Sequence, residues 1–167
     1  MLLGFKTQFA GYVEEGSKTH TIRARRKTRP KIGEICHCYT GLRTKQARLL
    51  GRWRCVKVER IMIYERGDKT FGVEIEGVEL STDEKNALAW RDGFRTELRA
   101  GAFAVMMRFW MKTHGNAEGP ESFVFEGDLI HWNYAERCDA PRAAPSPMEW
   151  GRQFELLGED LEEDEYT

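Results

Sequence analysis

The segment 16–23 carries the side chains of this chain that are best suited to chemistry. It reads Gly-Ser-Lys-Thr-His-Thr-Ile-Arg. In an extended strand, Thr21 and Arg23 point to one face, whereas Lys18 stands at the mouth of the strand on a long stem that can turn to either face. A threonine hydroxyl attacks as a nucleophile only when a base removes its proton, and a lysine serves as that base when burial or nearby cations lower its pKa. The plainer interpretation is an ordinary strand with β-favouring threonines and solvated charges.

A strongly basic region surrounds this segment. From Ser17 to Arg60 there are fourteen lysines and arginines and only two acids, Glu34 and Glu59, although the whole chain has a net charge of −1. Such a region attracts polyanions, and an arginine suits a phosphate or a base edge. Each phosphate contact on a single strand would steepen the log–log dependence of binding on salt by about 0.7. The cations that could grip phosphates fall in two predicted loops, which hold Arg25, Arg26, Lys27 and Arg29, and Arg43, Lys45 and Arg48.

Two aromatic residues, Tyr39 and Trp53, lie among these charges. An exposed aromatic ring can stack on a nucleic-acid base, and such a contact is worth roughly 1–3 kcal/mol. A lone aromatic residue on a strand more often packs in the core. Tyr39 is therefore a candidate base-binding residue, and Trp53 fits the core better.

The cysteines and histidines do not follow a metal-binding pattern. Cys36, His37 and Cys38 alternate between the two faces of a predicted strand, so they cannot jointly chelate one ion. We therefore predict no metal and no other cofactor. Four cysteines are too few and too irregular for a disulfide scaffold, no apolar run is long enough to span a bilayer, and no signal peptide begins the chain. These features favour the cytoplasm, reduced thiols and no membrane contact.

Residue patterns predict a compact α+β domain around the segment 16–23. Ser81 and Glu84 have the spacing of a capping box, which marks the start of a helix. Gly16 can end a short helix that precedes the segment. We expect helices over about 9–13, 81–90 and 96–114, and strands over 19–24, 35–40, 49–63, 73–80 and 122–132.

The chain changes character after residue 135. We predict one domain over 1–135 and a flexible region over 136–167, made of a proline-rich linker and an acidic tail. From Ser146 onward there are eight acids and a single basic residue, Arg152. The tail could serve solubility alone, compete with nucleic acid for the basic region, or bind a partner as the active part of a regulatory adaptor.

Four sequence blocks occur in the order expected of a known family. They are Gly-x-Lys-Thr-x-Thr-Ile-Arg at 16–23, Pro-Lys-Ile-Gly-Glu at 30–34, Tyr-Thr-Gly-Leu-Arg-Thr-Lys at 39–45 and Leu-Ala-x-x-Asp-Gly-Phe at 88–94. Together they resemble ASCH domains of the PUA-like superfamily, of the kind common in phages and prophages. The resemblance covers roughly residues 5–132. It implies a small β-barrel of about five or six strands flanked by helices, with a cleft lined by the segment 16–23.

The resemblance also implies a function. PUA-like relatives bind RNA or single modified bases, and some small ASCH proteins hydrolyse the amide of N4-acylated cytidines with a lysine, a threonine and a glutamate. Lys18 and Thr21 fill the first two positions, Arg23 matches a basic residue of the motif, and Asp92 replaces the glutamate with one methylene fewer. Asp92 would hold Lys18 and raise its pKa unless burial opposes this effect. The sequence Asp-Gly-Phe is also typical of a plain loop between two helices.

Three functions are compatible with these residues. The first is hydrolysis of N4-acylated cytidines by Lys18, Thr21 and Asp92. The second is a module that binds RNA or another nucleic acid without chemistry. The third is cleavage of RNA in the same cleft, because a lysine and hydroxyl groups near phosphates can assist transesterification. The expected partner is a modified nucleoside or RNA, and the sequence predicts no particular oligomeric state.

Overall fold

A mixed sheet of seven strands and three helices make up the part of the chain that the computed structural model describes, residues 1–98, 100–114 and 123–138. This part is α+β, as the sequence predicts. In chain order the elements are β1 (Leu2–Phe5), α1 (Thr7–Glu14), β2 (His20–Ala24), β3 (Ile35–Thr40), β4 (Arg48–Glu65), β5 (Phe71–Ile75), β6 (Val78–Glu79), α2 (Thr82–Arg91), α3 (Ala102–His114) and β7 (Val124–Arg137).

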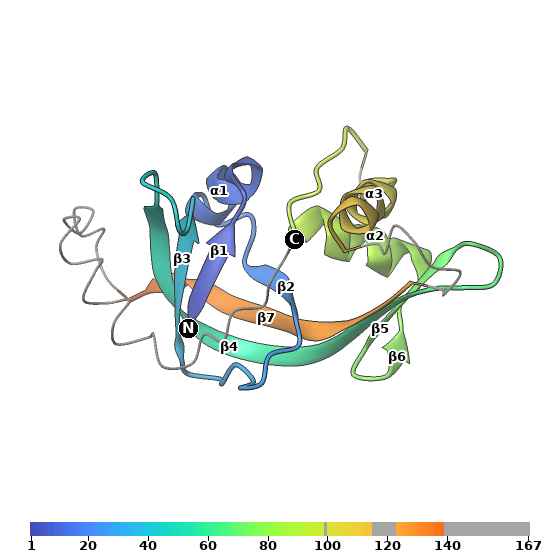
Figure 1. Ribbon diagram of the computed structural model, residues 1–167, viewed down its shortest axis with the longest axis horizontal. Coiled ribbons are helices and arrows are strands. Elements are labelled where there is room, and N and C mark those ends of the chain that lie inside the picture. The colour runs from blue at the N-terminus through green and yellow to red at the C-terminus, as the bar shows by residue number, and fades with distance from the viewer. Residues whose placement is uncertain (99, 115–122, 139–167) are drawn as a thin grey trace.

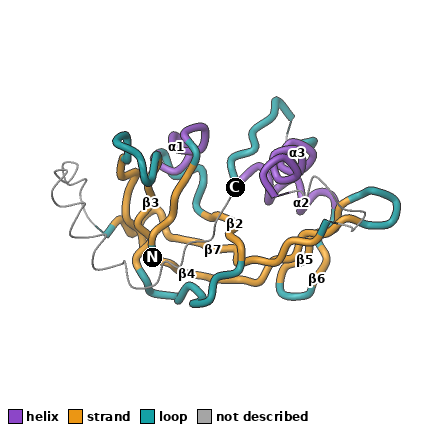
Figure 2. The backbone as a smooth tube through the Cα atoms, in the orientation of Figure 1, coloured by secondary structure: helices purple, strands orange, loops and turns teal. Residues whose placement is uncertain are grey.

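Two long antiparallel strands, β4 and β7, form the base of the molecule (Figure 1). The first part of β4 also pairs with β3, and its last part pairs with β5. Trp53, Ile61 and Ile63 of β4 are buried, while several residues between them are exposed, which is the alternation of a strand with one covered face. Figure 2 shows loops at the ends of this ribbon, below it between β2 and β3, and above it between α2 and α3.

The helices cover the same side of the β4–β7 ribbon at its two ends (Figure 1). Helix α1 lies over β3 and β4, and α2 packs against α3 over the other end. Aromatic side chains join these parts. Phe9 of α1 contacts Phe94 and Phe109 edge to face, with ring centroids 5.2 and 5.8 Å apart, and Trp110 of α3 packs on Phe125 of β7 at 4.4 Å.

The expected β-barrel of about five or six strands is wrong, because the described sheet has seven strands and is not closed. The strands follow the path β1-β3-β4-β7-β2, and no backbone ladder joins β1 to β2 among the described residues. The guanidinium of Arg23 on β2 instead donates to the main-chain oxygen of Gly4 on β1. Arg26 approaches the oxygen of Leu2 at 3.5 Å. Arginine side chains thus use the carbonyl groups that a ladder would need, and the sheet stays open between these two edges.

Most predicted elements are present, with shifted ends. Strand β3 and the capping box of Ser81 and Glu84 are confirmed. Strand β1 was not predicted, and helix α3 begins at Ala102, several residues later than expected. Strand β7 continues to Arg137; the rest of the predicted linker and the acidic tail, from residue 139 onward, lie outside the described residues. The described helices include none with the length and apolarity that a membrane span requires.

Candidate active site

Lys18 and Asp92, which are 74 residues apart in the chain, meet in the interior. The Lys18 amine donates to a carboxylate oxygen of Asp92 and, at 2.7 Å, to the main-chain oxygen of the same residue. Only 2% and 9% of the two side chains are exposed. A buried charge requires a partner of this kind. The contact expected from the sequence is therefore present, and the shorter carboxylate does reach the amine.

The backbone on both sides of Lys18 is fixed by neighbouring elements. Its N–H donates to the oxygen of Tyr12 near the end of α1, at 2.9 Å. The oxygen of Thr19 accepts from the N–H of Trp132 on β7, at 3.0 Å. Gly16 makes the turn between α1 and this segment with φ of +80°, a conformation that favours glycine. Lys18 precedes the first residue of β2, so its side chain is free of the strict alternation of the strand.

Asp92 is held by the turn that ends α2. It is the C-cap residue of the helix, and Gly93 follows with φ of +99°. The N–H of Gly93 donates to the oxygen of Trp90 at 3.1 Å, and the N–H of Phe94 donates to the oxygen of Ala89 at 3.0 Å. This pair of bonds is the Schellman motif, which satisfies the last carbonyl groups of a helix. The Asp-Gly-Phe sequence is thus both a helix end and the support of the carboxylate.

Lys18 also stabilises the helix itself. The C-terminus of a helix carries a partial negative charge and unpaired carbonyl groups, and a cation there is favourable. The amine of Lys18 meets both needs by bonding the main-chain oxygen of Asp92. The contact of Lys18 with Asp92 therefore has a structural role. A test of its chemical role must measure product formation or its pH dependence in a variant that still folds.

Burial opposes the charged form of both partners. Burial lowers the pKa of Lys18 below its usual 10.5, and the Asp92 carboxylate raises it by less. Burial raises the pKa of Asp92 above its usual 3.8, against the effect of Lys18. A lysine with a lowered pKa is neutral more often, and the neutral amine is the form that accepts a proton. The effect of burial on the pKa of Lys18 is thus larger than the effect of pairing with Asp92. The sequence alone does not show which of these two effects is larger.

A second buried base, His20, lies beside this pair. Its Nε2 atom is 3.7 Å from the Oδ1 atom of Asp92 and has no hydrogen-bond partner within the described part of the chain. Burial, followed by the charge of Lys18, holds the pKa of His20 well below 6.5. Its ring centroid is 5.5 Å from that of His131, which contacts Glu59 at 2.9 Å. His20 is therefore a neutral neighbour that adds no charge to the pair.

A cavity of about 430 Å³ opens beside the pair, at the edges of β1 and β2. We call it the β1–β2 cavity. Its polar lining includes Lys18, Thr21, Arg23 and Asp92, so the structure brings the predicted catalytic residues and Arg23 to one place. Five of the sixteen residues that line it are aromatic, and aromatic side chains are common in sites for small organic ligands. These aromatic residues are Phe5, Phe9, Phe94, Phe109 and Trp110.

Thr21 brings a hydroxyl group to this cavity. The residue is buried in β2 and pairs with Ile130 of β7. No hydrogen bond of its hydroxyl is found among residues 1–98, 100–114 and 123–138. The Lys18 amine directs two of its three hydrogens at Asp92, so one position on the nitrogen is left for another partner. Catalytic hydrogen bonds are often absent before a substrate binds.

Arg23 is one of four cations that line the β1–β2 cavity besides Lys18. Besides its bond to Gly4, its guanidinium lies over the ring of Phe5, with the carbon 5.1 Å from the ring centroid. Its Nε atom is buried without a hydrogen-bond partner among the described atoms. Burial also lowers the pKa of Arg23 below its usual range. Arg23 is thus a fixed cation whose donors are not all used.

Three other predicted binding residues come from the loop after β2. Arg25 and Arg26 line the β1–β2 cavity, whereas Arg29 lines a neighbouring one. Two of these arginines already have carboxylate partners. Arg25 is 3.3 Å from Glu126, and the Nε atom of Arg29 donates to Asp128 at 2.9 Å. The positive charge of the basic region is therefore partly neutralised by acids of β7.

The remaining predicted binding residues lie elsewhere. Arg43 and Lys45 are exposed in the loop between β3 and β4 and are not among the residues that line the β1–β2 cavity. Tyr39 is only 3% exposed, so its ring cannot stack on a base in this structure. Trp53 is fully buried and stacks on Trp132, with ring centroids 6.2 Å apart. The core interpretation of these two aromatic residues is thus the better one.

Sequence reasoning missed most of the aromatic wall. Phe109 and Trp110 belong to the apolar stripe of α3, and Phe5 belongs to the unpredicted strand β1. No sequence signal distinguishes a residue that lines a cavity from one that fills a core. The order of the Gly16–Arg23 and Leu88–Phe94 blocks was the signal that linked Lys18 to Asp92.

No similar protein was found for the chain in comparisons with family models, curated proteins and solved structures. Within the described residues, no group of three His, Cys, Asp or Glu side chains is placed to hold a metal ion. The geometry of the β1–β2 cavity and the resemblance of its residues to the ASCH pattern are therefore the observations that bear on function.

Proposed function

We propose that the protein is an ASCH-type hydrolase that binds an N4-acylated cytidine in the β1–β2 cavity and cleaves its amide. The observation that carries this proposal is the buried contact of Lys18 with Asp92 in the cavity that Thr21 also lines. A nucleophile, a base and a carboxylate that holds the base are the parts that such a reaction needs. The aromatic walls suit the flat faces of a nucleobase.

The chemistry follows from the residues of the cavity. In the proposed reaction the oxygen of Thr21 attacks the acyl carbon and its proton passes to the neutral amine of Lys18. The carbon–nitrogen bond then breaks as Lys18 returns the proton to N4, which releases cytidine. Water hydrolyses the threonine ester and releases the carboxylic acid. Thr21 could instead position the water for direct attack, and this route yields the same products.

Arg23 and Asp92 support these steps in different ways. The guanidinium of Arg23 supplies positive charge for the oxyanion that forms during attack. Asp92 touches Lys18 and positions its amine. Because burial lowers the pKa of Lys18, the amine can act as a base nearer to neutral pH than a free lysine.

Product analysis tests the proposal. The purified protein should convert N4-acetylcytidine to equal amounts of cytidine and acetate, and Thr21→Ala should abolish this conversion. Thr40→Ala is the matched control, because Thr40 is also a buried strand threonine but does not line the cavity. Absence of products from the wild type, or equal rates for wild type and Thr21→Ala, would overturn the assignment of Thr21 as a catalytic residue.

A second candidate is a nucleic-acid-binding module without chemistry. It is favoured by the exposed cations Arg25 and Arg26, which line the mouth of the same cavity. Binding of RNA that weakens steeply with salt, together with no change in N4-acetylcytidine, would support this candidate. The third candidate is a ribonuclease. Incubation with end-labelled RNA tests it, because a ribonuclease would shorten the labelled RNA and a binding module would leave it intact.

A further inference from the structure

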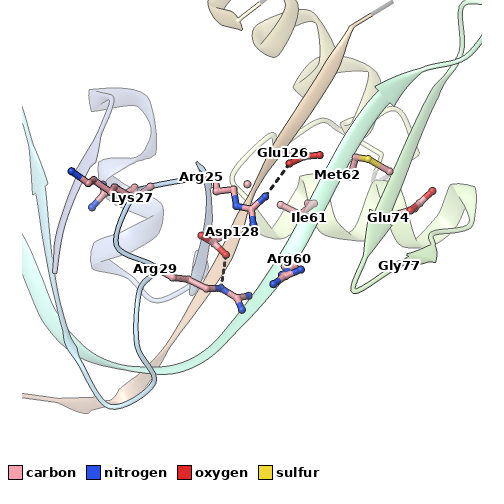
Figure 3. A pocket seen from close by; sticks show the side chains of 12 residues that line it. Arg25, Lys27, Arg29, Arg60, Ile61, Met62, Glu74, Gly77, Glu126 and Asp128 are labelled. Carbon is pink, nitrogen blue, oxygen red and sulfur yellow. Dashed lines mark hydrogen bonds and ion pairs between the residues drawn. The ribbon is translucent and has the colours of Figure 1, made fainter. Parts of the chain in front are cut away.

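A second cavity, of about 330 Å³, lies between the loop after β2 and the strands β4, β5 and β7 (Figure 3). We call it the β4–β7 cavity. Five cations and three carboxylates line it. Figure 3 shows the guanidinium groups of Arg25, Arg29 and Arg60 gathered around one part of this cavity, while Lys27 points away from them.

A buried carboxylate sets the position of Arg29. The side chain of Asp128 is only 5% exposed, and it accepts from the Nε atom of Arg29 at 2.9 Å. This bond uses one edge of the guanidinium and leaves the terminal nitrogens for other partners. One of them is 3.8 Å from Glu76, beyond the distance of a strong hydrogen bond. Asp128 therefore holds an arginine with donors to spare in the β4–β7 cavity.

The charges of the cavity are unevenly paired. Glu126 is engaged by Arg25 at 3.3 Å and Asp128 by Arg29, which leaves Glu74 as the third carboxylate of the lining. The guanidinium of Arg60 makes no ion pair with any acid of the described chain. Arg60 and Asp128 are register partners on β4 and β7, so the two cations beside Asp128 face one small region. The Glu76 carboxylate accepts from the main-chain N–H of Arg60 at 2.7 Å, and an added anion would bond the guanidinium donors that Glu76 does not engage.

The two cavities are neighbours. Arg25 and Arg26 line both of them. A ligand with an aromatic base in the β1–β2 cavity and a chain of negative charges leading away from it would pass over these two arginines and reach Arg60. A single-stranded nucleic acid has this form, because each base carries a phosphate on a flexible backbone.

We propose that the β4–β7 cavity binds a backbone phosphate of a single-stranded nucleic acid whose base occupies the β1–β2 cavity. The substrate class is then a polynucleotide that carries the modified base, and a free nucleoside lacks the second contact. Placement of the base rests on the proposed function. The phosphate contact rests on Arg29, Arg60 and Asp128.

Binding measurements with two probes test this inference. One probe is the nucleoside N4-acetylcytidine, and the other is a single-stranded RNA of about eight nucleotides with one N4-acetylcytidine. Arg60→Gln should weaken binding of the RNA about fivefold and reduce its salt slope by about 0.7, without a change in binding of the nucleoside. Arg54→Gln is the matched control, because Arg54 is an exposed arginine of the same strand that donates to the oxygen of Gly33 outside this cavity.

Each outcome separates this inference from the proposed function. Conversion of the nucleoside together with an RNA affinity that Arg60→Gln leaves unchanged would overturn the phosphate site and keep the proposed reaction. An RNA affinity that depends on Arg60 without conversion of either probe would keep the phosphate site and overturn the reaction. Equal weakening by Arg54→Gln and Arg60→Gln would indicate a general effect of charge and would overturn the site.

Discussion

Asp92 presents both its carboxylate and its main-chain oxygen to the amine of Lys18, because it is the C-cap residue of helix α2. A residue in the middle of a helix could not do this, since its carbonyl group would be bonded within the helix. The shorter acidic side chain is therefore sufficient at this position. The geometry of the pair depends on the turn that Gly93 makes.

Gly93→Ala should disturb the pair through this turn. An added Cβ would lie 2.8 Å from an atom of the Phe9 ring, in a residue whose φ is +99°. Gly101→Ala is the matched control, because Gly101 has the same φ of +99° and nothing within 4 Å of an added Cβ. Urea unfolding should show Gly93→Ala to be less stable than the control by about 1–3 kcal/mol. Equal losses would mean that the contact with Phe9 does not constrain the turn.

Removal of the carboxylate should cost more stability than removal of an exposed one. Asp92→Ala leaves the buried Lys18 amine without its charged partner, and we expect a loss of about 3 kcal/mol in the free energy of unfolding at neutral pH. Glu14→Ala breaks an exposed ion pair with Arg48 and should cost less than about 1 kcal/mol. Denaturant titration of the two variants measures the difference. A similar small loss in both would show that the buried pair does not stabilise the fold.

Acid should destabilise the protein through His20. Burial holds the pKa of His20 well below 6.5 in the folded chain, so the unfolded chain takes up a proton that the folded chain does not as the pH falls through 6.5. The free energy of unfolding should then fall by up to about 1.4 kcal/mol per pH unit from this residue, and the loss is absent well above pH 6.5.

The variant His20→Leu isolates this effect. Its free energy of unfolding should depend less on pH between about 7 and 5 than that of the wild type. His131, whose pKa is also lowered by burial, remains in both proteins. Parallel curves for the two proteins would show that His20 is not held neutral by the fold.

Asp92→Asn should move the pH dependence of the proposed reaction. The rate requires neutral Lys18 and should rise with pH through a pKa below 10.5. The Asp92 carboxylate is the main influence that raises this pKa, so its loss should shift the rise of kcat/KM to lower pH. Glu126→Gln, which removes an exposed carboxylate beside Arg25, should leave the profile unchanged. An unshifted profile in Asp92→Asn would assign the titration to a group other than Lys18.

Local elements of the fold could be predicted because their signals are local. The capping box at Ser81 and the alternation over 35–40 depend on residues within a few positions of one another. Strand β1 is four residues long and pairs in parallel with β3, so its partner lies more than thirty positions away. Closure of a barrel depends on such distant pairing. The bond from Arg23 to Gly4 between the open edges has no sequence signal.

The candidate site was predictable in part for the same reason. Lys18 and Asp92 could be linked only through the order of the resembling blocks, because no local rule joins residues 74 positions apart. The sequence predicts that the basic region attracts polyanions along its whole length. In the structure, Arg25 and Arg29 are paired with acids from β7. Such ion pairs depend on which strands are neighbours in the sheet, and no local sequence pattern predicts the order of the strands.

The release of cytidine and acetate from N4-acetylcytidine by Lys18→Met tests the central claim most directly. Lys85→Met is its matched control, because Lys85 is a half-buried lysine that donates to the oxygen of Phe71, at 3.2 Å, outside the β1–β2 cavity. We predict equal release of both products by the wild type and Lys85→Met, and none by a folded Lys18→Met. Release by Lys18→Met at the wild-type rate, or no release by the wild type, would contradict the account.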